Sequence, residues 1–281
     1  MLKSQAINLL ISTRRKFSNS YTIIKFFFGL KPYFEDPFTA LVYSLYTGFS
    51  SGSSNVEFVF HIQNLEFYAR PKDKFTLEEI LIKHEYNFLP QLITDSNKYV
   101  ILDLGANIGL FSLYTFSQIM NCRIYAFEPS NSTYNILVKN SKINPQLEWE
   151  VYNYAIWSKN GTVNIHNNTF STASRIAFPG EDYEIVPSIN LSNIIETIIQ
   201  KPVDIMKMDI EGAEEDVLCG NEEILNSIKC SVIEIHPNRC NQYRVLSTLN
   251  SKYKYIYRIA KRNSSKPLII GSNRSLFTTI L

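Results

Sequence analysis

ILDLGANIGLFS, residues 101–112, runs from an apolar strand through a glycine turn into a helix. In an open α/β sheet this order is the usual entrance to a nucleotide pocket, because ligands bind beyond the carboxyl ends of the strands. A dinucleotide turn of the GxGxxG type needs three glycines, but Asn107 and Leu110 stand at its second and third places. The stretch therefore favours a nucleotide-type ligand and disfavours a nicotinamide dinucleotide.

A second pattern fits the turn better: an acid followed by glycines at every second position. Asp103, Gly105 and Gly109 meet it, and Asn107 is the exception. Asn is a mild departure there, because it tolerates a positive φ better than most non-glycine residues. The next expected strand ends in Glu128, whose carboxylate can accept both ribose hydroxyls of a nucleoside and would repel a 2′-phosphate.

From residue 99 onward, strand patterns alternate with helix patterns. Expected strands are 99–105, 123–129, 148–156, 203–210 and 230–236, and expected helices are 110–120, 132–143, 191–199 and one from about 213. Each parallel crossover needs a helix to bring the chain back, so the alternation predicts an α/β fold with a mostly parallel sheet and helices on both faces. Two strand-like runs at 253–260 and 275–281, with no helical pattern between them, predict an antiparallel closing pair.

The segments before the sheet divide the chain into three expected parts, an extension, a hairpin with a helix, and a catalytic domain, at residues 1–50, 51–98 and 99–281. The extension ends in the Gly- and Ser-rich loop 48–55. Two short β-branched and aromatic runs then predict a hairpin. Thr76, with Glu79 three residues on, forms a capping-box pattern that predicts a helix reaching residue 93.

Ionisable side chains gather at the ends of the fourth and fifth expected strands. Asp209 and Glu211 stand where the fourth strand ends, and Glu234 and His236 end the fifth strand in the same way. If the two strands are neighbours, their carboxyl ends bring these groups to one rim of the pocket.

The residues just after Glu211 have a simpler structural interpretation. Gly212 provides a tight turn. Glu214 and Glu215 are expected to form the solvated first turn of the next helix, where the helix dipole stabilises them. None of the three is needed for ligand binding in this interpretation.

These motifs resemble the FkbM family of S-adenosylmethionine-dependent methyltransferases. The resemblance rests on DLGANIG, AFEPS, NYAIWSKNG and above all KMDIEGAEEDVLCG followed by VIEIH, and it covers roughly residues 76–281. It implies a class I methyltransferase fold, Rossmann-like, with a seven-stranded sheet and an antiparallel C-terminal strand, and S-adenosyl-L-methionine as cofactor. By that likeness the cofactor contacts fall at the methionine end on Asp103, Gly105, Ala106, Asn107 and Gly109, at the ribose on Glu128, and near the adenine on Asn153 and Ala155.

The resemblance also implies methylation of a hydroxyl group on a sugar, a glycan or a small natural product. An alcohol is a poor nucleophile at neutral pH, so a positioned base helps by taking its proton. Asp209 and His236 are the candidate catalytic bases, with Glu211 as an orienting or alternative base. The site is predicted to work without a metal, although these side chains would also suit Mg²⁺ or Mn²⁺.

The acceptor is expected to be selected by residues 158–187, an irregular polar segment, and by the N-terminal region, because both lie outside the motifs. Phe170, Phe178 and Tyr183 are candidates to stack on a sugar. Three alternatives stay open: a dinucleotide oxidoreductase, a nucleic-acid methyltransferase and a cofactor-binding scaffold without activity. The missing glycines count against the first, and the lack of a basic stripe beside the motifs counts against the second.

Composition and charge set broader limits. With 45% hydrophobic and 19% charged residues, the chain is typical of a globular protein, and a net charge of +2 does not suggest nucleic acid as a partner. Four scattered cysteines predict neither disulfides nor a zinc site, and the cytoplasm is the default compartment.

The first 34 residues carry six basic side chains and no acid, but no apolar run long enough to cross a membrane. The simpler interpretation is a solvated flank whose apolar residues dock on the main domain. An organellar presequence and weak association with a membrane surface through the N-terminus are the alternatives.

Overall fold

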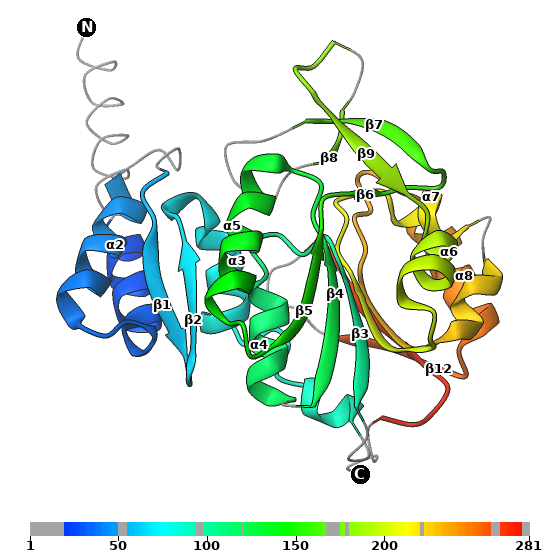
Figure 1. The fold of residues 1–281 in the computed structure, drawn as a ribbon, viewed down its shortest axis with the longest axis horizontal. Helices are drawn as coiled ribbons and strands as arrows, with labels where there is room; N and C mark the ends of the chain where they lie inside the picture. Colours follow the sequence, from blue (N-terminus) through cyan, green and yellow to red (C-terminus); the bar gives the residue numbers. More distant parts are fainter. Residues whose placement is uncertain are drawn as a thin grey trace, which may run out of the picture.

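The computed structural model describes residues 20–49, 55–93, 98–119, 121–166, 175–177, 180–219, 222–259 and 265–276. Its centre is a seven-stranded sheet of order β12-β13-β11-β10-β3-β4-β5 (Figure 1). The strands are β3 Tyr99–Leu104, β4 Cys122–Phe127, β5 Glu148–Tyr152, β10 Val203–Met208, β11 Ile228–Glu234, β12 Tyr255–Ile259 and β13 Leu268–Ser272. Among these seven strands β13 alone runs opposite to the other six. The predicted sheet is therefore confirmed, including its antiparallel C-terminal strand.

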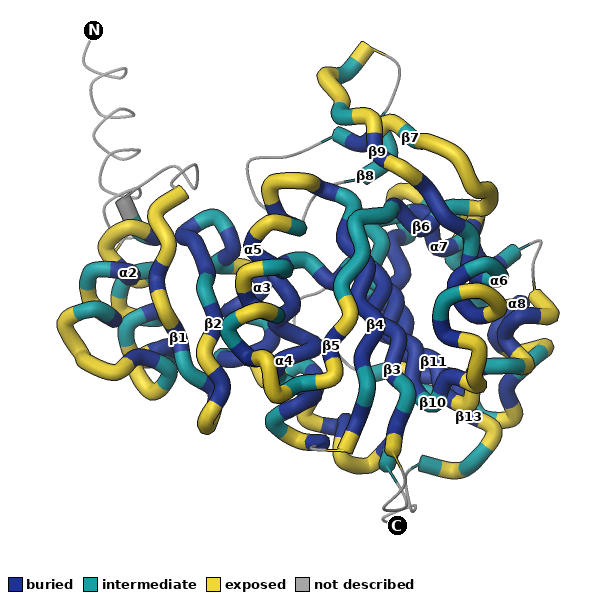
Figure 2. Tube along the Cα trace, viewed as in Figure 1, coloured by how far each residue is buried: buried dark blue, intermediate teal, exposed yellow. Residues whose placement is uncertain are grey.

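The sheet is buried on both faces, as the apolar strands predict. Along β3, Ile101 belongs to one hydrophobic core, whereas Leu102 and Leu104 belong to the other, because side chains alternate along a strand. Helices α4 Leu110–Gln118 and α5 Asn131–Ile143 complete the first core, and the second is completed by α6 Leu191–Asn193, η6 Ile194–Ile199, α7 Glu214–Leu218, η7 Glu222–Ser227 and α8 Gln242–Lys252. Figure 2 shows the central strands as the continuous buried interior between these layers.

An N-terminal unit packs beside α5. It comprises a helix over residues 20–30, the turn η1 Lys31–Tyr33, α2 Pro37–Phe49 and the antiparallel pair β1 Phe58–Ile62 and β2 Leu65–Ala69. Aromatic rings fill its interior: Phe60 stacks on Phe67, and Tyr43 meets Phe60 edge-on. The predicted hairpin is present, and apolar side chains of the extension do dock on it. Within the described residues, no helix has both the length and the apolar character to span a bilayer.

Two asparagines attach the hairpin to the main sheet's helices. Asn140 on α5 accepts from the backbone N–H of Tyr68 at 2.7 Å and donates to the carbonyl of Ile108 at 2.8 Å. One turn later, Asn144 donates to the carbonyl of Glu66 at 2.7 Å. These bonds satisfy polar backbone groups along β2 and link it to the glycine turn after β3.

The helix predicted from Thr76 to residue 93 is wrong in its start and its length. The Thr76 hydroxyl makes no hydrogen bond to a described residue, whereas Asp73 accepts from the backbone N–H of Arg70 at 2.7 Å. The buried Arg70–Asp73 ion pair therefore fixes an earlier start. The segment consists of short pieces, namely η2 Pro71–Asp73, α3 Lys74–Leu77, the π-helical turn η3 Glu78–Ile82 and the 3₁₀ turn η4 Leu89–Leu92.

Residues 148–156 do not form one strand, which corrects a second prediction. The chain leaves the main sheet after β5 and enters a second sheet of order β6-β9-β7-β8. Its strands are β6 Ala155–Ile156, β7 Gly161–His166, β8 Arg175–Ile176 and β9 Glu184–Ile189. Most of them lie in the segment expected to be irregular. Pairs such as Val163 with Val186 join residues far apart in the sequence, and a local pattern does not reveal them.

The closing pair is antiparallel as predicted, but its second strand differs. β12 pairs with β13, which lies within the stretch expected to be a loop. Of the predicted strand 275–281, residues 277–281 lie outside the described residues. So do Phe170, Phe178, residues 50–54 of the expected Gly- and Ser-rich loop, and residues 1–19.

Candidate functional site

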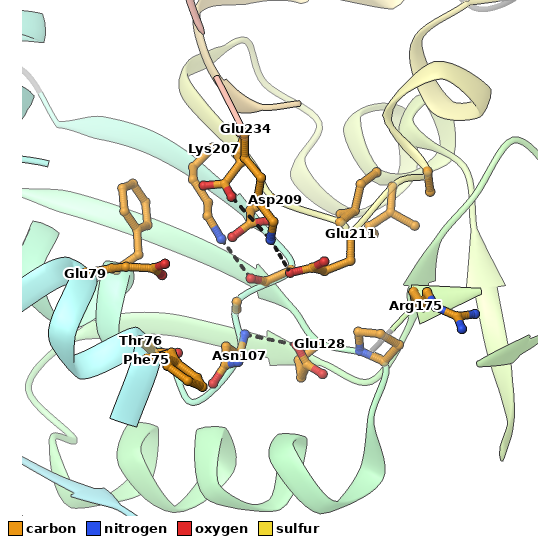
Figure 3. A pocket seen from close by; sticks show the side chains of 18 of the residues that line it. Phe75, Thr76, Glu79, Asn107, Glu128, Arg175, Lys207, Asp209, Glu211 and Glu234 are labelled. Carbon is orange, nitrogen blue, oxygen red and sulfur yellow. Dashed lines mark hydrogen bonds and ion pairs between the residues drawn. The ribbon is translucent and has the colours of Figure 1, made fainter. Parts of the chain in front are cut away.

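A cavity lies at the carboxyl ends of the parallel strands, between the main sheet, the small sheet and the α3–η3 segment (Figure 3). Seven of the predicted site residues line it, namely Gly105, Ala106, Asn107, Glu128, Ala155, Asp209 and Glu211. The other four, Asp103, Gly109, Asn153 and His236, are not among the described lining residues. The structure thus brings residues of the glycine turn and the rim acids to one cavity.

Gly105 packs tightly against the backbone at the ends of the two neighbouring strands, β4 and β10. Its φ of 75° is left-handed, and its N–H donates to the carbonyl of Phe127 at 3.0 Å. A Cβ at this position would stand 1.9 Å from the backbone carbonyl oxygen of Asp209. Glycine is therefore required here both by conformation and by space.

Asn107 and Glu128 form the central contact of the turn. Asn107 has a φ of 54°, and its backbone N–H donates to Glu128 Oε2 at 2.9 Å. The other carboxylate oxygen accepts from the N–H of Ser130 at 3.0 Å, and Asn153 donates to the Glu128 carbonyl at 2.9 Å. Burial raises the pKa of Glu128, the two backbone N–H donors lower it, and the result is a pKa of about 7.

Asp103 and Lys207 form a buried pair beneath the turn. Lys207 Nζ lies 3.3 Å from Asp103 Oδ1 and donates to the carbonyl of Gly105 at 2.8 Å. Ser112, near the start of α4, donates to the other Asp103 oxygen at 2.7 Å. Burial alone would lower the pKa of Lys207, but the negative charges of Asp103 and Asp209 outweigh it and raise the pKa. Asp103 therefore supports the turn from behind.

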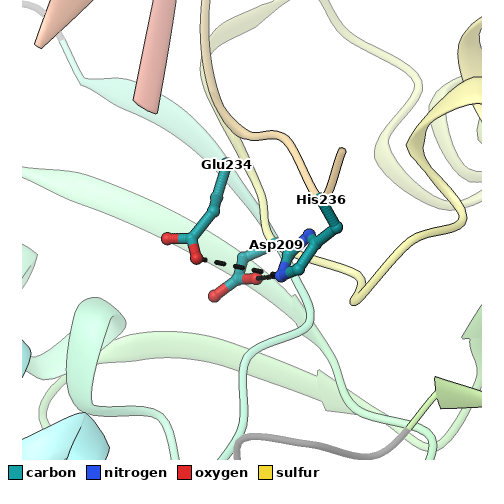
Figure 4. Close-up of side chains that lie close together, drawn as sticks. All are labelled: Asp209, Glu234 and His236. Atoms are coloured by element: carbon teal, nitrogen blue, oxygen red, sulfur yellow. Dashed lines mark ion pairs between the residues drawn. The ribbon is translucent and has the colours of Figure 1, made fainter. Parts of the chain in front are cut away.

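His236 is the centre of a carboxylate cluster at the ends of β10 and β11, which are parallel neighbours as the sequence analysis required. Its Nε2 lies 3.3 Å from Glu211. The same atom lies 3.7 Å from Asp209 and 3.8 Å from Glu234 (Figure 4). On the other side of the ring, Nδ1 is hydrogen-bonded to Glu214 at 2.8 Å. The predicted grouping of acids around a histidine is present.

The electrostatics of this cluster favour positive charge. Burial alone would lower the pKa of His236, but the nearby carboxylates of Glu211 and Glu214 and the charge of Asp209 raise it to about 10. Lys266, 3.1 Å from Glu211 and 3.5 Å from Glu234, also has a raised pKa because the same acids outweigh its burial.

Sequence analysis missed two important contributors. Glu214 is fully buried, so its assignment to a solvated helical turn is wrong. The signal was available: Glu214, Val217 and Leu218 share one helical face, and Val217 and Leu218 are apolar. Lys266 reaches the cluster from the segment before β13, and no local pattern marked it.

The family model that matches this chain and two of its curated relatives are described as methyltransferases. The model of the methyltransferase FkbM domain matches residues 103–257, more than half of the chain. The hexuronic acid methyltransferase AglP of Haloferax volcanii is 23% identical over 218 residues, covering 77% of this chain and 85% of the relative. The methyltransferase sdnD of Sordaria araneosa is 28% identical over 207 residues, covering 60% of this chain and 78% of the relative.

Solved structures are more distant. The METTL16 methyltransferase domain is 10% identical, with a TM-score of 0.47 and coverage of 70% of this chain and 69% of that one. WbdD is 14% identical, with a TM-score of 0.42, and the match covers 70% of this chain but 40% of WbdD. Both are likenesses of fold alone.

Proposed function

The chain belongs to the family of FkbM methyltransferase domains, and on that basis we propose that it transfers a methyl group from S-adenosylmethionine to a hydroxyl group of a sugar or a small natural product. Its sheet is that of a class I methyltransferase. One observation supports the proposal most directly: the Asn107–Glu128 turn and the acidic rim at Asp209 and Glu211 line the same cavity. A methyl donor bound at the turn and an acceptor bound at the acidic rim would therefore meet in this cavity.

The donor would extend along the turn. Glu128 would accept the ribose hydroxyls, and the backbone from Gly105 to Asn107 would follow the methionine part. Ala155 lines the cavity beyond Glu128, in the position proposed for the adenine. Asp103, Gly109 and Asn153 would act from behind, because they hold the turn rather than line the cavity.

The chemistry is an in-line displacement. The acceptor oxygen attacks the methyl carbon, the carbon–sulfur bond breaks with its electron pair left on sulfur, and the hydroxyl proton passes to a base. We assign the base to Asp209, whose side chain is 28% exposed and lines the cavity. His236 is buried behind it and would position it, and Glu211, which is paired with Arg239 at 2.6 Å, would orient the acceptor.

A further residue of the cavity, Arg175, indicates the class of acceptor. Arg175 on β8 also lines the cavity, and its guanidinium is held by Glu181 at 2.5 and 2.8 Å. A cation at this position would suit an acceptor that carries a carboxylate, such as a uronic acid. The relative named for hexuronic acid is consistent with that class.

Labelled S-adenosylmethionine tests the function, with mass-spectrometric identification of the product. We expect label on a hydroxyl of a uronic acid or glycan, and a loss of about 100-fold in kcat in Asp209→Asn. Glu148→Gln, on the outer strand β5, is the matched control and should keep full activity. Label appearing in RNA while sugars stay unlabelled would contradict the assignment.

We also propose that the N-terminal helices contact an anionic membrane surface. Tyr21, Ile24 and Phe28 are 68%, 56% and 69% exposed and share one face of the helix over residues 20–30. A second exposed stripe on α2 has the same three- and four-residue spacing and consists of Phe38, Leu41 and Leu45. The acid-free basic stretch that precedes Glu35 complements anionic lipid headgroups.

Vesicle flotation tests this contact. Binding to vesicles that contain phosphatidylserine should be lost in the double variant Phe28→Glu and Phe38→Glu, with methyl transfer unchanged. Tyr243→Glu, at a residue 75% exposed on α8, should bind like the unaltered protein. If light scattering instead shows a dimer that the double variant dissociates, the stripes form a protein interface and the proposal fails.

A further inference from the structure

Three ligand-type side chains converge at the acidic rim. Asp209, Glu234 and His236 each offer one donor atom, and these atoms lie within 4.8 Å of one another. Ligands of an ion bound at about 2.1 Å are roughly 3–4 Å apart, so modest side-chain rotations would close the set. We propose that these three residues bind a divalent cation, of the Mn²⁺ or Mg²⁺ class, at the edge of the cavity.

The histidine supplies an observation independent of the acids. His236 is 3% exposed, and its Nε2 makes no hydrogen bond to any described residue. This nitrogen nevertheless points toward Asp209 and Glu234 (Figure 4). A buried polar atom is normally satisfied, and an ion between the three side chains would satisfy this one.

Glu214 provides the support that a metal-bound imidazole needs. It lies on the opposite edge of the His236 ring, hydrogen-bonded to Nδ1 at 2.8 Å, and is itself fully buried. A carboxylate in this place fixes the tautomer with the proton on Nδ1, so that Nε2 presents its lone pair to the ion. The hydrogen bond from Gly212 N–H at 3.0 Å fixes the same Glu214 oxygen.

The charges also leave room for one divalent cation. An ion bound at Nε2 would displace the proton that His236 otherwise carries there. With His236 then neutral, the ion-paired cluster around it has four carboxylates and two cations, Asp209, Glu211, Glu214 and Glu234 against Arg239 and Lys266. Two negative charges therefore remain, and a divalent ion would neutralise them. Asp209 and Glu234 both line the cavity, so the ion would be accessible from it, with His236 as its inner ligand.

Such an ion would change the role of Asp209. This role rests on the proposed methyl transfer. The ion would bind the acceptor oxygen and lower the pKa of the acceptor hydroxyl, and Asp209 would serve as a ligand of the ion. The released proton would pass to Glu211, while the methyl carbon still moves from sulfur to oxygen as described above. The binding of the ion itself does not depend on this reaction.

Electron paramagnetic resonance of added Mn²⁺ tests the site. The folded protein should bind the ion, and the pulsed spectrum should show nitrogen coupling from one imidazole. His236→Gln should abolish that coupling, and Asp209→Asn, at the rim, should weaken binding at least about tenfold. Glu148→Gln should match the unaltered protein, and thermal melts establish that each variant is folded.

The outcomes separate the two proposals. If the unaltered protein binds no Mn²⁺ at millimolar concentration, or binds it without nitrogen coupling, the metal site is wrong. If Mn²⁺ binds with the coupling but no sugar or small-molecule hydroxyl is methylated, the site stands and the proposed function fails. Methyl transfer at full rate after chelation would show that the reaction does not need the ion, although the protein can bind it.

Discussion

The glycine turn and the acid–histidine cluster border the same cavity but are built differently. The turn is local: one strand, its loop and the end of the next strand supply Gly105, Asn107 and Glu128, and backbone N–H groups make the main contacts. The cluster draws side chains from the end of β10, the end of β11 and the segment before β13. The turn therefore depends on backbone conformation, and the cluster on the pairing of buried charges.

The two regions meet at Gly105. The backbone carbonyl of Asp209 occupies the space that a side chain at Gly105 would need. Lys207, on strand β10 of the cluster, donates a hydrogen bond to the carbonyl of Gly105. The proposed donor and acceptor sides are thus directly connected, which the proposed in-line displacement requires because small misplacements of the reacting atoms are costly.

Gly105→Ala should have the largest effect, because it damages both regions at once. The added Cβ meets backbone at 1.9 Å and the residue must keep a φ of 75°, so we expect a loss of more than about 4 kcal/mol in the free energy of unfolding. Denaturant unfolding measures it. Gly180→Ala is the matched control, since its φ is 88° but nothing lies near its Cβ, and should cost about 1 kcal/mol. Equal losses in the two variants would mean that the contact with Asp209 is unimportant.

Glu214→Ala tests the cluster alone. It leaves His236 Nδ1 and the N–H of Gly212 without their acceptor in a buried place, and we expect a loss of about 3 kcal/mol in unfolding free energy. Glu215→Ala, one residue along, removes an ion pair with the exposed Arg244 and an exposed hydrogen bond from the Asn241 N–H at 2.8 Å, and should cost about 1 kcal/mol. Similar melting temperatures for both variants would contradict the difference in burial.

This pair of glutamates illustrates how far the sequence could predict the site. The alternation of strands and helices and the glycine turn follow from local pattern. The meeting of Asp209 with His236 was predicted on the condition that the two strands are neighbours, and the parallel pairing of β10 and β11 meets that condition. The position of Glu214 follows from helical periodicity, which the helix dipole interpretation overlooked. The helix dipole favours an acid in a first turn whether its side chain is exposed or buried, so the presence of the acid alone does not indicate where the side chain lies.

Other features depended on tertiary contacts that no local pattern encodes. The small sheet pairs β7 with β9, although β8 lies between them in the sequence, and Lys266 arrives from a segment rich in Ser and Asn. The start of the helical segment before β3 was misplaced because a buried Arg70–Asp73 pair outweighs the Thr76 capping pattern. Long-range pairing and charge burial, rather than propensity, account for the errors.

Glu128 should give the donor side a pH dependence that the cluster lacks. With a pKa of about 7 in the folded protein, it is protonated below that pH, but must be ionised to accept both ribose hydroxyls. The affinity for S-adenosylhomocysteine should therefore fall about tenfold for each pH unit below 7 and level off above it. Calorimetry at pH 5.5 to 8 measures this, and Glu128→Gln should flatten the profile.

The stability of the unliganded protein should change in the opposite direction. Because the folded pKa of Glu128 is raised above its unfolded value, its contribution is fully present below about pH 4.5 and is lost as the pH rises through about 7. A donor affinity that does not vary between pH 5.5 and 7 would show that the carboxylate does not hold the ribose.

Asn107 gives the smallest and most local test. Asn107→Leu must hold a branched side chain at a φ of 54° and loses the bond from Ile108 N–H to Asn107 Oδ1 at 2.7 Å, so we expect a cost of about 2 kcal/mol and weaker donor binding in a folded protein. Asn107→Gly keeps the conformation and loses only the side chain. If Asn107→Gly binds S-adenosylhomocysteine as well as the unaltered protein, the residue matters for its backbone. If Asn107→Gly binds as weakly as Asn107→Leu, the side-chain amide itself contacts the donor, and the turn binds through a side chain as well as through its backbone.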